Sequence, residues 1–123
     1  PYKFKNNKKG LYMAGWYEIN KTDDGQYRFV LKAGNGEVIL SSELYKAKSS
    51  VHIGIESVRR NSVNDSRYER LEAKNGKPYF NLKAVNYQII GRSRFYSSEQ
   101  SREKGIESVK KNGSTTKIKE LIV

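Results

Sequence analysis

The chain has 123 residues, of which 36% are hydrophobic, 30% are charged and none is Cys. This length suits one domain with a thin core, and the absence of Cys together with a single His excludes disulfide frameworks, thiolate sites and multi-histidine metal sites. No apolar run reaches the roughly 20 residues that a membrane-spanning helix needs. We therefore expect a soluble cytoplasmic protein with no membrane association. We also expect no metal and no cofactor.

The net charge of +11 is distributed unevenly along the chain. Residues 1–12 carry four Lys and no acid, residues 13–66 are balanced, and residues 67–123 carry thirteen basic against six acidic side chains. Because Met13 runs directly into a strand pattern, we expect residues 1–12 to be a leader or an N-terminal extension outside the fold. The remaining excess of positive charge then belongs to the second half of the chain.

The chain repeats itself at an offset of 51 positions without a gap. Residues 16–62 align with residues 67–113, and 18 of the 47 pairs are identical. The longest match sets Gly54-Ile55-Glu56-Ser57-Val58 against Gly105-Ile106-Glu107-Ser108-Val109. We interpret this pattern as a duplication. Residues 13–123 then form a single domain made of repeat 1 (16–66) and repeat 2 (67–123).

Alternation of apolar and polar residues predicts three strands in repeat 1, near residues 16–21, 26–33 and 37–45. The sequence Asp23-Asp24-Gly25 fits a three-residue hairpin loop with Gly in the left-handed conformation, which pairs Tyr17 with Leu31. In repeat 2 the same reasoning pairs Tyr68 with Leu82. The third strand is expected to place one set of alternating residues on a single face: Val38, Leu40, Ser42 and Leu44.

A period of 3.6 residues predicts helices over residues 47–61 and 98–112. In the second, Ser97 with Gln100 fits a capping box, and Gly113 is a typical helix terminator. Gly inside a helix costs about 0.8–1 kcal/mol relative to Ala. Its presence at matched positions therefore predicts close approach of the helix backbone to the sheet or to the other helix. The predicted close-packing positions are Gly54, Ser57, Gly105 and Ser108.

These elements predict an α+β fold. A tandem duplication of a strand-strand-strand-helix-strand motif would form one mainly antiparallel sheet with two helices on one face. The strand at residues 67–73 is expected to close the first copy while it opens the second. The tail, residues 117–123, is expected to close copy two as an edge strand.

Two pairs of segments carry a resemblance to a known family. YRFVLKAGNGEVILSSELY is followed by GIESVRRNS, and PYFNLKAVNYQIIGRSRFY by GIESVKKNG. Over residues 13–113 the chain resembles the YegP-like family of small bacterial proteins; the segment before Met13 and the tail depart from it. The resemblance implies two repeats that assemble one sheet. Because the family has no established activity, it implies no catalytic or binding residue.

Several cations are candidate contacts for an anion or a nucleic acid. Arg59, Arg60, Lys110 and Lys111 lie at the matched ends of the two helices, where they can grip phosphates or, as we favour, offset the helix dipole. Lys83 is expected on the sheet face opposite the helices. The excess cations of repeat 2 can form a patch or simply raise solubility; they include Arg92, Arg94 and Arg102.

No residue pattern indicates catalysis, because the lone His52 has no predicted partner or pocket. We therefore expect a non-catalytic binding or accessory module, monomeric and with an unidentified partner. One alternative is weak, salt-sensitive nucleic-acid binding through the basic second repeat. Another is self-association through exposed sheet edges.

Overall fold

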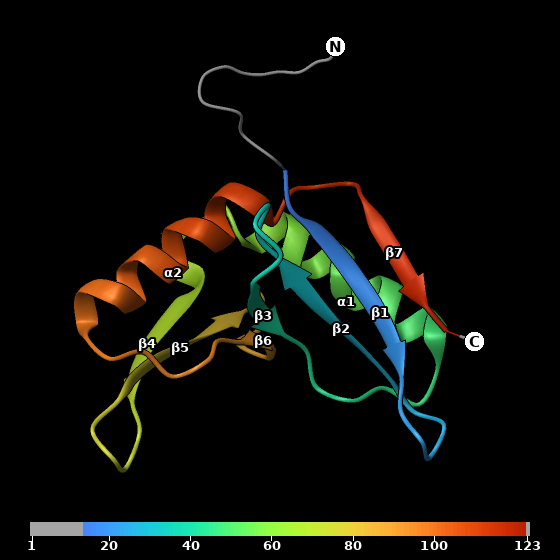
Figure 1. Cartoon of the computed structure of the whole chain (residues 1–123), viewed down its shortest axis with the longest axis horizontal. Coiled ribbons are helices and arrows are strands. Elements are labelled where there is room, and N and C mark those ends of the chain that lie inside the picture. Colours follow the sequence, from blue (N-terminus) through green and yellow to red (C-terminus); the bar gives the residue numbers. More distant parts are fainter. Residues whose placement is uncertain (1–13, 123) are drawn as a thin grey trace.

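The computed structural model describes residues 14–122, so the expectation for residues 1–12 lies outside the described part. Figure 1 shows a twisted sheet with helices packed against it. In chain order the elements are β1 (Trp16–Lys21), β2 (Tyr27–Lys32), β3 (Val38–Ser41), α1 (Lys48–Asn61), the 3₁₀ helix η2 (Asp65–Arg67), β4 (Tyr68–Glu72), β5 (Pro78–Lys83), β6 (Ile89–Arg92), α2 (Glu99–Asn112) and β7 (Ile118–Leu121).

One sheet contains all seven of these strands, in the order β4-β5-β6-β3-β2-β1-β7. Every neighbouring pair is antiparallel except β1 and β7. The two copies meet where β3 pairs with β6 through Ser41 and Arg92. These two residues occupy the same position of the repeat, so a pseudo-twofold axis passes between them. The predicted fold class is confirmed.

The two strands that follow the helices lie elsewhere than predicted. β4 is an edge strand that pairs with β5, so it does not close the first copy. β7 pairs in parallel with β1, so the tail completes copy one and not copy two. The reason is that α2 ends beside the start of β1, where the Tyr17 hydroxyl donates to Gly113 O at 2.7 Å. The strand that follows α2 cannot pair with β2, because β1 already does so. It pairs with the outer edge of β1 instead.

Both hairpins have the predicted register, with Tyr17 opposite Leu31 and Tyr68 opposite Leu82. Gly25 has a φ of 84°, as the predicted loop requires. The third strand was predicted wrongly. It ends at Ser41, and a β-bulge beside Lys32 breaks the alternation. As a result the adjacent residues Ile39 and Leu40 are both buried, whereas Val38 and Leu44 are exposed.

Both helices pack on one face of the sheet, and each touches strands of both copies: α1 lies against β2, β5 and β6, and α2 against β5, β3 and β2. Between them lies one core, whose fully buried side chains are Tyr17, Ile19, Phe29, Leu31, Leu40, Val51, Ile55, Val58, Phe80, Leu82, Ile106 and Val109. Within residues 14–122, neither helix has the length and apolar character to cross a membrane.

The ends of α2 differ from the predicted caps. The N-cap is Ser98, whose hydroxyl accepts from Ser101 N at 3.1 Å, in place of the expected pair Ser97 and Gln100. Gly113 follows the last helical residue but keeps a right-handed φ of −65°. A Cβ on Gly113 would collide with the Ser62 hydroxyl. Close approach, and not a left-handed turn, therefore explains this glycine.

The matched helix glycines also lie in close contact, although with side chains and not with the backbone expected from the sequence. A Cβ on Gly54 would lie 2.7 Å from the Tyr45 hydroxyl, and one on Gly105 would collide with the Tyr96 hydroxyl. Ser57 and Ser108 are half-buried, and the carbonyl of each accepts from an Asn amide one turn later. The small edge of each helix thus makes room for a tyrosine.

Two contacts on the pseudo-twofold axis join equivalent positions that carry different residues. Leu40 meets Gly91 in the sheet, where a Cβ on Gly91 would lie 2.6 Å from Leu40 Cγ. Ser62 meets Gly113 between the helix ends. In both contacts repeat 2 supplies the glycine. Identical copies with Leu at both positions would collide, so the divergence of the two repeats is part of how this chain packs.

Candidate functional site in the grooves beside the β5–β6 turn

Four of the predicted contact residues have close carboxylate partners, and a fifth, Arg94, lies 4.0 Å from Glu37. Arg59 pairs with Glu56, Lys83 Nζ lies 3.0 Å from Glu69, and Arg102 Nε lies 3.2 Å from Glu103. Lys110 Nζ lies 2.8 Å from Asp65 and 3.3 Å from Glu107. These ion pairs reduce the charge that the four cations present to a ligand.

Three of the acidic partners, Asp65, Glu69 and Glu103, have a lowered pKa and remain ionised well below neutral pH. The Lys110 ammonium and then the Arg70 guanidinium hold the pKa of Asp65 below its usual value. Arg70 does the same for the pKa of Glu103, and Lys83 for that of Glu69. Since hydrogen bonds and opposite charge favour the ionised carboxylate, these pairs persist at physiological pH.

The other predicted contact residues lie in different places. Arg60 and Lys111 are exposed near the ends of α1 and α2. Arg92 Nε donates to Asn81 Oδ1 at 3.1 Å, and Arg94 lies 5.2 Å from the centroid of the Tyr96 ring. Arg92 and Arg94 line one cavity, and Arg60 lines another. The predicted cations therefore do not form one site.

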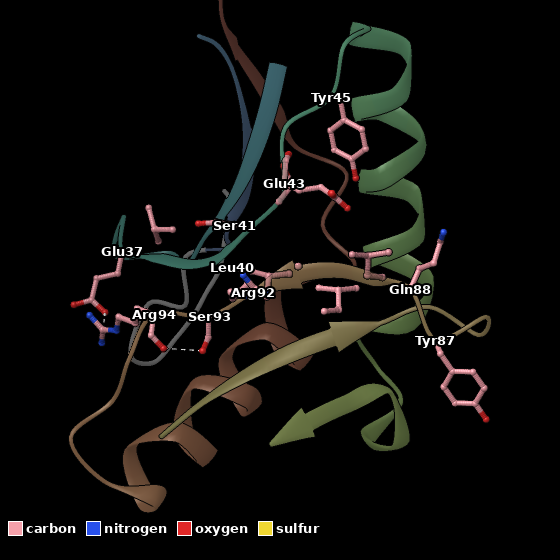
Figure 2. Close-up of a pocket in the computed structure, with 15 residues that line it drawn as sticks. Glu37, Leu40, Ser41, Glu43, Tyr45, Tyr87, Gln88, Arg92, Ser93 and Arg94 are labelled. Carbon is pink, nitrogen blue, oxygen red and sulfur yellow. Dashed lines mark hydrogen bonds and ion pairs between the residues drawn. The ribbon is translucent and has the colours of Figure 1, made fainter. Parts of the chain in front are cut away.

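The first cavity, which we call the strand crevice, has a volume of about 980 Å³. It exists because β3 and β6 are paired only at Ser41 and Arg92 and part on either side. Figure 2 shows Glu37 and Arg94 joined at one end of the crevice, and Glu43, Tyr45 and Gln88 at the end near α1. Its lining mixes acids, guanidinium groups, hydroxyls and apolar side chains, so it favours no single ligand class.

The second cavity, which we call the α1 groove, has a volume of about 800 Å³ and lies between α1 and the β5–β6 turn. Its floor is the small edge of α1: Ser50, Gly54, Ser57 and Asn61. Ile53 and Val85 form exposed apolar walls, at 71% and 68% exposure. Tyr45, Gln88 and Ile90 line both cavities. The sequence identified the small edge of α1 but not that a groove runs over it.

The rim of the α1 groove is cationic. Arg60 and Arg67 line it, and Arg67 Nε donates to Asn61 Oδ1 at 3.1 Å. No Asp or Glu lines this groove in the described part of the chain. The groove can therefore hold an apolar side chain beside a carboxylate. Residues 14–122 contain no group of three or more His, Asp or Glu side chains placed to hold a metal ion.

Repeat 1 and repeat 2 differ at the residues that shape the groove and its turn. The positions matched to Ile53, Val85 and Tyr87 are Lys104, Gly34 and Gly36. Tyr87 has a φ of 69°, the left-handed conformation that Gly36 adopts in repeat 1. For a residue other than Gly this conformation costs about 1–2 kcal/mol. Since the Tyr87 side chain is 80% exposed, packing does not repay that cost.

Comparison with known proteins finds relatives of this chain. Residues 23–69 and 73–120 match the family model described as a domain of unknown function, DUF1508. The chain is 71% identical over 109 residues to a UPF0339 protein of Acinetobacter baylyi, covering 89% of this chain and 98% of that protein. It is 60% identical over 108 residues to the UPF0339 protein YegP of Escherichia coli, covering 88% and 98%.

A solved structure supports the architecture. The solution NMR structure of a UPF0339 protein from Shewanella oneidensis matches with a TM-score of 0.84 at 60% identity, over 89% of this chain and 93% of that one. The names of these relatives assign no reaction and no ligand.

Proposed function

The chain belongs to the DUF1508 family of uncharacterised repeat proteins, and we propose that it is a non-catalytic binding module that holds a segment of a partner protein in the α1 groove. The proposed segment carries an apolar side chain next to a carboxylate. The observation that carries this proposal is the lining of the groove, which has apolar walls, two guanidinium groups on the rim and, among residues 14–122, no acid.

The apolar walls supply the first reason. Ile53 and Val85 stand exposed on either side of a floor of small residues. Apolar surface rimmed by polar groups is typical of interaction sites. Complete burial of an Ile or Val side chain contributes about 1.5–3 kcal/mol, so one ligand side chain inserted between these walls supplies a useful share of a micromolar affinity.

The charge of the rim supplies the second reason. Neither Arg60 nor Arg67 pairs with a carboxylate within residues 14–122, and guanidinium groups bind carboxylates in bidentate geometry. A basic ligand would be repelled, whereas an acidic one meets complementary charge. Electrostatic complementarity of this kind raises specificity and association rate.

The divergence of the repeats supplies the third reason. The floor of the groove has the same residues in both copies, as in Gly54 with Gly105 and Ser57 with Ser108. The apolar walls differ: repeat 1 contributes Ile53 where repeat 2 has Lys104, and repeat 2 contributes Val85 where repeat 1 has Gly34. The apolar walls thus arise only where α1 meets the turn of repeat 2.

Catalysis finds little support at this place. The imidazole of His52 lies outside the lining of both cavities and faces Glu120 at 4.0 Å across an exposed surface. A general base must lie within hydrogen-bond reach of a bound substrate. The groove offers hydroxyls and guanidinium groups with no adjacent base.

A random dodecapeptide phage library panned against the full chain tests the proposal. We expect selected peptides to carry Asp or Glu beside Leu, Ile or Phe, and to shift amide resonances of residues 53–61 and 84–90. Ile53→Lys, which installs the residue of the matched position, and Arg60→Glu should each weaken binding at least about tenfold. Lys104→Ser is the matched control and should leave binding unchanged. Selected peptides that lack acids, or that bind Ile53→Lys as well as the wild type, would refute the proposal.

Self-association through the sheet edges is a separate matter, and we expect a monomer. The edge strands β4 and β7 carry charged residues, among them Arg70, Lys119 and Glu120. Charges on an edge strand oppose pairing with another chain. Sedimentation velocity over a wide concentration range should give one monomer mass, and a concentration-dependent dimer would contradict this expectation.

A further inference from the structure

The sheet face opposite the helices carries two aromatic rings in repeat 2, of which Phe95 is exposed and Tyr79 is half-buried. Phe80 and Leu82 point to the core, so Tyr79 and Asn81 point to the other face. The rings of Tyr79 and Phe95 contact each other edge to face, with centroids 5.4 Å apart. Phe95 is 58% exposed. We call the group Tyr79, Asn81, Arg92 and Phe95 the outer platform.

A guanidinium is held beside these rings. Arg92 Nε donates to Asn81 Oδ1 at 3.1 Å, and the Asn81 amide in turn donates to Glu69 Oε1 at 3.2 Å. Asn81 is 3% exposed, so a buried amide orients an exposed Arg. Within residues 14–122 the Arg92 guanidinium makes no other hydrogen bond or ion pair, so its remaining donors can point toward a ligand. A cation fixed in this way loses less entropy when it binds an anion.

The carboxylates on this face are already engaged. Glu69 pairs with Lys83 at 3.0 Å, and the matched Glu18 pairs with Lys32 at 3.2 Å and accepts from Trp16 Nε1 at 2.8 Å. The Trp16 indole and then Lys32 lower the pKa of Glu18, and Lys83 and then Asn81 lower the pKa of Glu69, so both stay ionised and paired at neutral pH. The surplus charge of the face is therefore positive.

Repeat 2 differs from repeat 1 at this surface. The positions matched to Tyr79, Arg92 and Phe95 are Arg28, Ser41 and Leu44. Repeat 2 thus has two rings and one guanidinium where repeat 1 has one guanidinium, a hydroxyl and an aliphatic chain. The change adds stacking surface and keeps the positive charge.

We propose that the outer platform binds single-stranded nucleic acid, with unpaired bases stacked on Tyr79 and Phe95 and a phosphate held by Arg92. A sheet face with exposed rings and cations is the kind of surface on which unpaired bases stack, tolerant of sequence. A duplex keeps its bases stacked inside, so the platform selects single strands. This site shares no residue with the α1 groove and goes beyond the binding function proposed for it.

Fluorescence anisotropy of the full chain with labelled oligothymidylate and oligouridylate tests the inference. We expect both to bind more tightly than a duplex of equal length, with affinity falling steeply as salt rises, by a slope of about 0.7 per phosphate contact. Phe95→Ser and Arg92→Ser should each weaken binding at least about fivefold. A preference between the two oligomers would show whether the 2′-hydroxyl contributes.

Matched variants separate the platform from simple charge attraction. Leu44→Ser changes the equivalent position of repeat 1, and Lys104→Ser removes one positive charge on α2, which lies on the other face of the sheet. Both controls should retain most of the affinity. The inference is overturned if neither oligomer binds at low salt, if Phe95→Ser binds as the wild type does, or if Lys104→Ser weakens binding as much as Arg92→Ser. Thermal melts verify that each variant is folded, and peptide binding in the α1 groove should survive Phe95→Ser.

Discussion

The contact between Leu40 and Gly91 makes a prediction about exchanging residues across the pseudo-twofold axis. Leu40 is fully buried and pairs with Leu31, while Gly91 pairs with the matched Leu82. The two positions therefore have equivalent surroundings, and one of them must be small. The variant that exchanges them, Leu40→Gly with Gly91→Leu, places the same atoms on the other side of the axis.

The single substitutions should be costly. Leu40→Gly leaves a cavity, which costs about 2–5 kcal/mol, and adds about 0.5–1 kcal/mol for Gly within a strand. Gly91→Leu forces a side chain into Leu40 Cγ, since a Cβ alone would lie 2.6 Å from it, and overpacking of this kind costs about 1–3 kcal/mol or more. The exchange keeps the volume constant, so we expect a loss below about 1.5 kcal/mol.

Urea unfolding at equilibrium, followed by circular dichroism and by the fluorescence of the single Trp16, measures these free energies. A double-mutant cycle should give a coupling of at least about 2 kcal/mol, the difference between the summed single losses and the loss of the exchange. If the loss in the double variant equals the sum of the single losses, the axial contact does not govern packing and the reasoning fails. Leu40→Ala with Gly91→Ala gives a milder cycle should a single variant fail to fold.

Further predictions concern the helix glycines, acid stability and the strained turn. Gly105→Ala should destabilise by about 1–3 kcal/mol because its methyl group collides with Tyr96, although an exposed helix Gly→Ala change stabilises by about 1 kcal/mol; a gain in the urea midpoint would contradict this. The fold lowers the pKa of Asp65 and that of Glu103. The stability that these two carboxylates contribute is therefore fully present above the carboxyl pKa of the unfolded chain, about 4. It is lost as the pH falls through the lower pKa values of the folded chain. The free energy of unfolding should therefore decrease at pH values under about 4, and Asp65→Asn should make this decrease less steep. If the variant loses stability as steeply as the wild type, the prediction is wrong. Tyr87→Gly should leave stability equal or higher, whereas Gly36→Tyr should lower it by about 1–2 kcal/mol, as melting temperatures of both variants will show.

Much of the fold could be predicted because the repeat doubles every local signal. Alternation and the loop at Gly25 define the first hairpin, and the matched loop at Gly76 repeats the argument with the same register. The bulge beside Lys32 could not be seen, because the sequence gives no sign that Ile39 is an extra residue between Val38, opposite Lys32, and Leu40, opposite Leu31. Pairing between the first and last strands could not be predicted either, since it depends on where α2 ends in space.

The candidate sites were less accessible to sequence reasoning. The small edge of α1 was identified, but whether it meets a helix, a strand or open space depends on how far the β5–β6 turn reaches. A signal was nevertheless available in the comparison of the copies: Val85 and Tyr87 replace Gly34 and Gly36 at matched turn positions. Large side chains at turn positions held by glycine in the other copy indicate a place where one copy has acquired another role.

The parallel pairing of β7 with β1 ties the beginning of the described chain to its end. During synthesis, repeat 1 emerges from the ribosome long before the strand that finishes its sheet, and both helices need strands of both copies for burial. Neither half can be completed alone, and folding must wait for contacts between residues most distant in sequence, which slows it. Until β7 forms, the nascent protein therefore has unpaired backbone groups on the outer edge of β1, with which strands of other chains can pair. Pairing of residues 118–121 with β1 ends this exposure.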